Sequence, residues 1–304
     1  MNGIVPLWKP TGMTSHDCVM KLRRLFRTKK VGHTGTLDPE VEGVLPICIG
    51  EATKIVPYLT DTKKTYRAEI TLGTATDTED QTGKVIEQKP VTEQMTEETI
   101  FEVLKQFEGE IEQLTPLYSA VKVKGKKLYE YARENQPVER PIRQVTIHSI
   151  DYVKESLSIE DETVKFKIIT TVSKGTYIRT LAVDIGKCLG YPAHMSHLVR
   201  TATADFNQEA TVTFEQLEQL KEMGRLASSL EPIEAGLTHL PSYQLDYHLA
   251  KKVSYGQKLA RPEGWHKDQP NQMVFNNQTL AIYSVHPEKP DQIKPLRVFN
   301  QTKF

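Results

Sequence analysis

The sequence predicts an α+β protein in which helices flank a mixed, largely antiparallel central sheet, with a small β-rich part at the C-terminal end. Residues 66–72 alternate between apolar and polar side chains, as a strand with one buried face does. Residues 145–153 and 164–172 give two further strands. At 304 residues, the chain can hold one large and one small domain.

The N-terminal part predicts a helix with a basic side. Thr14 and Asp17 form a capping-box pattern, which marks a helix start. Val19, Leu22 and Phe26 then repeat at helical spacing, so we expect them to form the buried stripe. The basic residues of this helix fall off the stripe: Lys21, Arg23, Arg24 and Arg27.

The middle of the chain predicts a second basic region. Residues 96–107 have a helical pattern, in an acidic and polar stretch where we find no catalytic or binding motif. Residues 116–123 read as a strand, 124–126 as a turn and 128–133 as the start of a helix. Lysines and tyrosines interleave here, which suits RNA because cations bind phosphates and rings stack on bases. An ordinary amphipathic helix with exposed lysines explains the pattern about as well.

A further helix follows Thr176, its predicted N-cap, and ends at Gly190, a suitable C-cap residue. Arg179 falls in the first turn of this helix. A positive charge there opposes the helix dipole at a cost of about 0.3–1 kcal/mol. Residues that break a local rule in this way are often functional, although an ordinary surface arginine explains the position about as well.

The last part predicts a helix opened by Thr213 and Gln216, then a domain boundary. The stretch 228–242 has irregular Pro and Gly content, so we expect one domain at 1–235 and another at 243–304. Short strand-like runs follow at 251–257, 273–275, 279–285 and 296–299, with a hairpin turn at 276–278. These runs predict a small β-barrel or sandwich.

Charge and cysteine content limit the classes to which the protein can belong. The formal net charge is zero, but residues 1–37 carry seven basic residues against one acid, and 115–145 carry seven against three. Such local patches attract a phosphate backbone. Three widely spaced cysteines, Cys18, Cys48 and Cys188, read as reduced core residues of a cytoplasmic protein. No apolar run approaches the ~18 residues that span a membrane, and the start lacks a signal-peptide pattern.

The stretch Gly32-His33-Thr34-Gly35-Thr36-Leu37-Asp38-Pro39 has the features of a site. Asp38 is the only acid between Asp17 and Glu40, its turn contains two glycines that allow close approach, and a buried strand at 44–49 follows. A lone carboxylate in this setting suits a nucleophile or a general base. The alternative is that Asp38 only caps the turn before the proline.

This stretch, continued by Gly43-Val44-Leu45-Pro46, closely resembles the signature of the tRNA pseudouridine synthase B family. Other family motifs resemble segments in compatible order: Lys9-Pro10-Thr11-Gly12, Lys64-Thr65-Tyr66-Arg67, residues 116–133, Lys174-Gly175-Thr176-Tyr177-Ile178-Arg179, and Ala193-His194 through Leu198-Val199-Arg200. The resemblance implies that Asp38 is catalytic, that Arg179 pairs with it, and that Tyr66 packs on the target base. It also implies substrate contacts by His33, Tyr177, Leu198 and Lys9.

The family's activity is isomerisation of uridine to pseudouridine at position 55 in the T-loop of tRNA, with the base flipped out. The resemblance thus implies the pseudouridine synthase fold, a PUA-like RNA-binding barrel at the C-terminal end, and no cofactor or metal. We expect a monomer that binds the T-arm stem-loop of tRNA and has no obligatory protein partner and no membrane.

Several alternatives stay open at this point. Asp38 could attack C1′ or remove a proton from C2′, and Tyr66 could take the C5 proton as well as stack. A phenol is almost wholly protonated at neutral pH, so stacking is the firmer role for Tyr66. Two rival functions are a non-catalytic tRNA-binding or RNA-folding module with the same fold, and a glycosylase or nucleoside hydrolase that uses a carboxylate at C1′.

Overall fold

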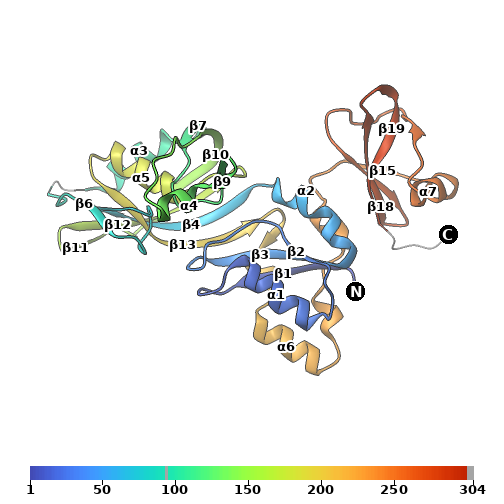
Figure 1. Cartoon of the computed structure of the whole chain (residues 1–304), viewed down its shortest axis with the longest axis horizontal. Coiled ribbons are helices and arrows are strands. Elements are labelled where there is room, and N and C mark those ends of the chain that lie inside the picture. The colour runs from blue at the N-terminus through green and yellow to red at the C-terminus, as the bar shows by residue number, and fades with distance from the viewer. Residues whose placement is uncertain (93–94, 300–304) are drawn as a thin grey trace. The chain divides into compact units, whose positions relative to one another are not determined.

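The computed structural model describes residues 1–92 and 95–299, and it has the mixed α+β architecture that the sequence predicts (Figure 1). The chain forms two compact units. The first comprises Met1–Glu40, Val44–Thr60 and the chain from Ala204 onward. The second comprises Val41–Gly43 and Asp61–Thr203. No helix among the described residues is long and apolar enough to cross a membrane.

The second unit is built on a sheet whose central strand is β4 (Lys64–Leu72). β4 pairs antiparallel with β13 on one side and β12 on the other, and the sheet continues through β10 to β7. Its other strands and the small hairpins of this unit are β5 (Thr74–Thr76), β6 (Val85–Gln88), β7 (Gly109–Leu114), β8 (Lys122–Val123), β9 (Lys126–Lys127), β10 (Ile142–Tyr152), β11 (Ser158–Glu160), β12 (Thr163–Val172) and β13 (Ala193–Thr203). Alternation along β4 buries Ala68, Ile70 and Leu72, as a period of two requires.

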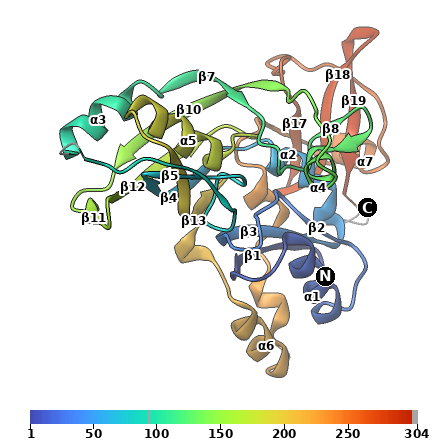
Figure 2. The ribbon, with the colours of Figure 1, turned by 60° about the vertical axis from the view of Figure 1, so that its left-hand side comes forward.

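Two helices cover one face of this sheet. α3 (Glu97–Lys105) packs against β10, and α5 (Ile178–Cys188) packs against β13 and β4 (Figure 2). The two helices also touch each other, so they lie on the same face. A third helix, α4 (Leu128–Arg133), follows the β8–β9 hairpin.

In the N-terminal part of the first unit, β1 (Gly3–Lys9) lies beside β3 (Glu42–Ile49), and β2 (Val31–His33) pairs antiparallel with β3. α1 (Ser15–Leu25) lies next to α6 (Phe214–Glu222), where Lys21 pairs with Glu218 at 3.1 Å. The remaining short elements of this part are η1 (Gly50–Ile55), α2 (Val56–Thr60), β14 (Phe206–Asn207), η2 (Gln208–Ala210), η3 (Leu226–Ser229) and η4 (Ile233–Gly236).

Strand β3 starts in the second unit, where Glu42 and Gly43 pair in parallel with Val199 and Arg200 of β13. Gly43 has a φ of +126°, a conformation that residues with a Cβ rarely adopt. A Cβ at this position would lie 2.2 Å from the carbonyl oxygen of Arg200. The close approach of the two backbones therefore requires glycine.

The C-terminal part of the first unit is a curled five-stranded sheet in the order β15-β17-β18-β19-β16, with one helix beside it. These elements are β15 (Ser242–Gln244), α7 (Tyr247–Ser254), β16 (Leu259–Ala260), β17 (Asn271–Phe275), β18 (Gln278–His286) and β19 (Lys289–Val298). Trp265, Tyr283 and Ile293 are among the buried residues of its own core. Ile282 and Phe299 instead join a core cluster that contains Ile4. The division at 235–243 into a catalytic and an RNA-binding domain stays a prediction.

Several local predictions are confirmed. Thr14 and Thr213 each open a helix with both hydrogen bonds of a capping box. Thr96 caps α3, the 124–126 turn has positive φ at its first two residues, and so does the hairpin turn at Asn276 and Asn277. These features depend on residues within four positions of one another, so the local sequence determines them.

Other predictions are wrong. Within the strand predicted at 116–123, only β8 forms, because the segment before it makes a bend. The strand predicted at 251–257 lies mostly in α7, which Asp246 caps by accepting a hydrogen bond from Leu249 N. The N-cap of α5 is Tyr177 instead of Thr176. Cys188 is exposed, while Cys18 and Cys48 are buried as expected.

Candidate active site

Asp38 lies on a turn between β2 and β3 that is fixed on both sides. On one side, Leu37 N donates a hydrogen bond of 2.9 Å to the hydroxyl of Ser15. On the other, Pro39 O accepts hydrogen bonds from Gly12 N at 2.9 Å and from Lys9 Nζ at 3.2 Å. Leu37 is buried and Asp38 is exposed. The turn therefore holds an accessible carboxylate on backbone that has little freedom to move.

Lys9 and His33 lie in the same unit as Asp38. The Lys9 side chain is fully buried, and its ammonium group also donates a 2.8 Å hydrogen bond to Pro10 O. These contacts tie the end of β1 to the Asp38 turn. His33 is the last residue of β2, pairs with Ile47 of β3 and is partly exposed. The structure thus brings three of the predicted site residues into one unit.

Arg179 lies in the second unit, in the first turn of α5, as the sequence predicts. Its side chain is 9% exposed. Nη1 donates a 3.0 Å hydrogen bond to Thr78 O, and Nη2 donates one of 3.2 Å to Tyr118 O. Nη1 also lies 3.5 Å from Asp80 Oδ2. Two chain segments remote in sequence therefore fix this guanidinium group.

Asp80 lies against the guanidinium of Arg179, a contact that the sequence does not predict. Its Oδ1 accepts hydrogen bonds from the Thr78 hydroxyl at 2.8 Å, from Thr82 N at 2.9 Å and from the Thr82 hydroxyl at 2.6 Å. This network leaves Oδ2 to face Arg179. The sequence does contain a pattern that indicates a turn here: Asp80 lies between Thr78 and Thr82, with Gly83 after them. Such a pattern is typical of a turn that side-chain hydrogen bonds stabilise.

The residue before Asp80 supports the same helix end. Glu79 Oε2 accepts a 2.6 Å hydrogen bond from the hydroxyl of Thr180, and Arg140 lies 3.9 Å from Glu79 Oε1. Burial raises the pKa of Glu79, and the hydrogen bond from Thr180 opposes that rise. A carboxylate at the N-terminus of α5 is also favoured by the helix dipole.

Tyr66 and Leu198 lie on one face of neighbouring strands. Tyr66 of β4 is directly opposite Arg200 of β13, and Ala68 is opposite Leu198. Directly opposed residues point to the same face, and residues two apart on a strand share a face, so Tyr66 and Leu198 are diagonal neighbours. Tyr66 is partly exposed, and Leu198 is 8% exposed.

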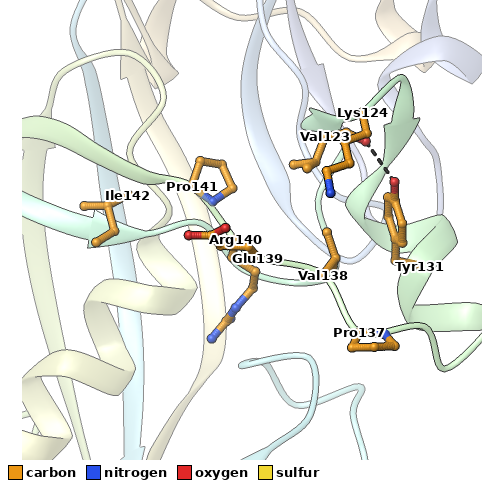
Figure 3. Close-up of a pocket in the computed structure, with 9 residues that line it drawn as sticks. All are labelled: Val123, Lys124, Tyr131, Pro137, Val138, Glu139, Arg140, Pro141 and Ile142. Atoms are coloured by element: carbon orange, nitrogen blue, oxygen red, sulfur yellow. Dashed lines mark hydrogen bonds between the residues drawn. The ribbon is translucent and has the colours of Figure 1, made fainter.

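A cavity of about 530 Å³ lies in the second basic segment (Figure 3). Its lining residues are Val123, Lys124, Tyr131, Pro137, Val138, Glu139, Arg140, Pro141 and Ile142, and none of them is a predicted site residue. The Tyr131 hydroxyl donates a 3.0 Å hydrogen bond to Val123 O across the cavity rim. Nearby, Lys126 lies over the ring of Tyr131 and Lys127 over that of Tyr129. The interleaved lysines and tyrosines of the sequence thus make cation–π contacts with each other.

No group of three or more His, Cys, Asp or Glu side chains among the described residues could hold a metal ion. The predicted site residues offer two kinds of charged group. These are a carboxylate on a fixed turn in the first unit, and a buried guanidinium with an aromatic residue in the second.

Comparison with known families assigns the chain to a class. Residues 23–178 match the description "TruB family pseudouridylate synthase (N terminal domain)", and residues 179–238 match "tRNA pseudouridylate synthase B C-terminal domain". Together these matches cover most of the chain. The protein is therefore a pseudouridine synthase, an enzyme that isomerises uridine.

Sequence identity to individual relatives shows which family of pseudouridine synthases the chain belongs to. The tRNA pseudouridine synthase B of Oceanobacillus iheyensis is 54% identical over 300 residues, which is 98% of each chain. That of Bacillus subtilis is 52% identical over 305 residues, covering 99% of this chain and 98% of the relative. The chain belongs to the tRNA pseudouridine synthase B family, as its sequence motifs predict.

The fold agrees with this assignment. A chain in the crystal structure of a Cbf5-Nop10-Gar1 complex matches with a TM-score of 0.74 at 29% identity, and the match covers 99% of this chain and 84% of that one. A chain in the structure of an H/ACA RNP bound to a substrate RNA containing 2'-deoxyuridine matches with a TM-score of 0.74 at 26% identity. That match covers 98% of this chain and 84% of the other.

Proposed function

We propose that this enzyme converts uridine 55 in the T-loop of tRNA to pseudouridine, with Asp38 as the catalytic carboxylate. The observation that carries this proposal is the Asp38 turn, in which an exposed carboxylate sits between two anchored residues, Leu37 and Pro39. A fixed, accessible carboxylate can meet the sugar of a nucleotide with little reorganisation, which is the main requirement of this chemistry.

The reaction needs only side-chain chemistry. The bond from ribose C1′ to N1 of uracil breaks, the freed uracil rotates, and C5 forms the new bond to C1′. C5 loses its proton and N1 gains one, so the product is an isomer of the substrate. Atoms and electrons balance without an oxidant, a reductant or a transferred group. Asp38 supplies either a nucleophile at C1′ or a base at C2′, and the protein requires no cofactor or metal for either route.

Arg179 is the proposed partner of the Asp38 carboxylate. A buried guanidinium stabilises negative charge strongly, because the low local dielectric screens it little. The two carbonyls that accept hydrogen bonds from Arg179 fix its plane, so it can orient a carboxylate as well as neutralise it. Asp80 balances part of its positive charge.

The other predicted residues bind the flipped nucleotide. Extruding a stacked base costs a few kcal/mol, and stacking on an aromatic ring returns about 1–3 kcal/mol. Tyr66 supplies that ring and Leu198, its diagonal neighbour, an apolar contact. His33 and Tyr177 contact the nucleotide or the space that it leaves, and Lys9 holds the catalytic turn beside it.

The remaining parts bind the T-arm of tRNA. The basic side of α1 and the basic region around β8 and β9 track phosphates, and the C-terminal sheet is proposed as a PUA-like RNA-binding domain. We propose a cytoplasmic monomer without an obligatory protein partner. Cys18 and Cys48 are both buried thiols, and burial raises the pKa of Cys48 to about 12, which keeps it unreactive.

Tritium release from tRNA labelled at uridine C5 tests this function, combined with chemical mapping of pseudouridine. The expected result is release of one tritium per tRNA with pseudouridine at position 55 alone, and no release from a tRNA with cytidine at that position. Free uracil among the products would instead show a glycosylase. RNA binding without tritium release would show a non-catalytic RNA-folding module.

A further inference from the structure

Gln113 makes an unusual pair of contacts with the start of α5. It lies on β7 with its side chain buried, and the residue is only 1% exposed. Its Oε1 accepts a 2.7 Å hydrogen bond from Tyr177 N, and its Nε2 donates a 2.9 Å hydrogen bond to Tyr177 O. One side-chain amide therefore satisfies both backbone groups of a single residue, 64 positions away.

Tyr177 is the N-cap of α5, and it lacks the side chain that this position normally uses. Ser, Thr, Asp or Asn at an N-cap accepts a hydrogen bond from the first turn, whereas Tyr177 makes no side-chain cap hydrogen bond. Its backbone is extended, with φ −97° and ψ 108°. The direction in which the helix starts is thus set from outside the helix, by Gln113.

The two hydrogen bonds between Gln113 and the backbone of Tyr177 form a clamp on the start of α5, and Arg179 is two residues beyond it. Its positive charge is disfavoured by the dipole of α5, whose N-terminus is also positive. The dipole therefore does not stabilise Arg179 in this position. The guanidinium keeps its place through long-range contacts to Thr78 and Tyr118. Those contacts have the right geometry only while the helix starts in the observed direction.

We propose that Gln113 is a positioning residue for the isomerisation, which fixes the N-cap of α5 and thereby the guanidinium of Arg179. The inference rests on the proposed function of Arg179 as the partner of the catalytic carboxylate. Gln113 touches neither the substrate nor the reacting atoms. Without its amide, Tyr177 N loses its acceptor, and Tyr177 O keeps only the hydrogen bond from Leu181 N, so α5 shifts to recover the lost hydrogen bonds. A displacement of about 1 Å in a catalytic group costs about a hundredfold in rate.

The test compares Gln113→Met with Gln144→Met in the full-length protein. Gln144 is an exposed glutamine on β10, next to the residue opposite Gln113, so it controls for the same substitution on the same sheet. We expect the single-turnover rate of Gln113→Met at saturating enzyme to fall about a hundredfold. Affinity for tRNA should stay within about threefold, and the control should match the wild type. A folded Gln113→Met protein with the rate of the control would overturn the inference.

Hydrogen exchange of the Tyr177 amide separates this inference from the proposed function. We expect faster exchange in Gln113→Met than in the wild type and in Gln144→Met. Unchanged protection of the Tyr177 amide would show that Gln113 does not hold the start of α5, whatever the rate of pseudouridine formation. If the wild type itself forms no pseudouridine 55, the proposed function fails, and the exchange measurement still decides whether Gln113 holds the helix start.

Gln113→Glu serves if the methionine variant does not fold. A protonated glutamic acid offers the same donor and acceptor as the amide, whereas a carboxylate offers only acceptors. Burial favours the protonated form and Arg143, directly opposite on β10, favours the charged one. We expect the rate deficit relative to the wild type to shrink as pH falls from about 8 to about 5. A deficit independent of pH would overturn the inference.

Discussion

Asp80 and Arg179 face each other at the start of α5, with Oδ2 of the carboxylate 3.5 Å from Nη1 of the guanidinium. The other carboxylate oxygen, Oδ1, is occupied by Thr78 and Thr82. The Thr78 carbonyl in turn accepts the shorter hydrogen bond from Arg179. One aspartate thus folds the loop whose backbone holds the arginine and also lies against its charge.

We expect Asp80→Asn to lower the rate of pseudouridine formation about ten- to a hundredfold while tRNA affinity changes little. The amide can keep the Oδ1 contacts, but its NH₂ group would then face the guanidinium, so Arg179 loses an acceptor and moves. Single-turnover kinetics and a binding titration measure the two effects. Asp151→Asn, an exposed aspartate on β10, is the control. An unchanged rate would show that the Thr78 and Tyr118 carbonyls suffice.

Asp38→Asn should abolish pseudouridine formation and leave tRNA affinity within a few fold. The amide has nearly the same shape, and the hydrogen bonds of its neighbours Leu37 and Pro39 remain, so the turn should persist. Only the charge and basicity of the side chain are lost. Tritium release over several hours detects residual turnover, with Glu40→Gln, another exposed acid near the turn, as control. Substantial turnover would remove Asp38 from the chemistry.

The sequence predicts the local parts of this site better than the long-range ones. The Asp38 turn, the strand of Tyr66 and the first-turn position of Arg179 all follow from a few neighbouring residues. The partners of Arg179 do not, because Thr78 and Asp80 lie about a hundred positions away in a stretch that read as acidic loop. Gln113 is likewise an ordinary polar residue on a strand until the fold brings it to Tyr177.

The two wrong strand assignments, at 251–257 and 116–123, have separate physical causes. The run 251–257 is short and contains only Val253 and Tyr255 as apolar residues, and so short a pattern does not distinguish a strand from a helix. Asp246 resolves the ambiguity by capping α7, and burial of Ala250 and Val253 at helical spacing stabilises it. At 116–123, the apolar residues alternate well enough for a strand, but in the structure only the last two residues find a strand partner, at β9.

Gly43→Ala should destabilise the protein by about 3 kcal/mol or more. The substitution forces a left-handed backbone on alanine, at about 1–2 kcal/mol, and places a Cβ 2.2 Å from Arg200 O, where backbone must shift. Gly125→Ala is the control, because φ is +87° there and no atom lies within 4 Å of the added Cβ. Urea unfolding of both variants measures the difference. Equal losses would mean that β3 and β13 separate at little cost.

Lys64 should make the stability of the protein depend on pH above neutrality. Burial and, next, the positive charge of Arg200 lower its pKa from 10.5 to about 8. Between these values the unfolded chain keeps a proton that the folded protein has released. The free energy of unfolding therefore rises with pH across this window, by at most about 1.4 kcal/mol per pH unit. Below pH 8 the unfavourable contribution of Lys64 is fully present.

Urea unfolding between about pH 7.5 and pH 10 measures this slope. Lys64→Met should flatten it, because the titrating group is gone, while Lys63→Met, an exposed neighbour, should leave it unchanged. The nearby charges of Asp61 and Lys174 pair with each other at 2.5 Å, and they should contribute equally in all three proteins. A slope that persists in Lys64→Met would assign the dependence to another group.

Binding of tRNA should weaken steeply with salt, and the basic region around β8 and β9 should account for part of that dependence. Each lysine that neutralises a phosphate of a structured RNA contributes about 0.7–0.9 to the slope of log K against log salt. Lys122 and Lys124 are exposed, so Lys122→Gln with Lys124→Gln should lower the slope by roughly one to two and leave the rate at saturation unchanged.

Lys187→Gln is the control, because Asp184 lies 3.1 Å from that lysine and already offsets its charge. Filter binding at several salt concentrations gives the slopes. If the double variant keeps the wild-type slope, this region does not track phosphates, and the cation–π contacts of Lys126 and Lys127 serve only to order the hairpin and α4.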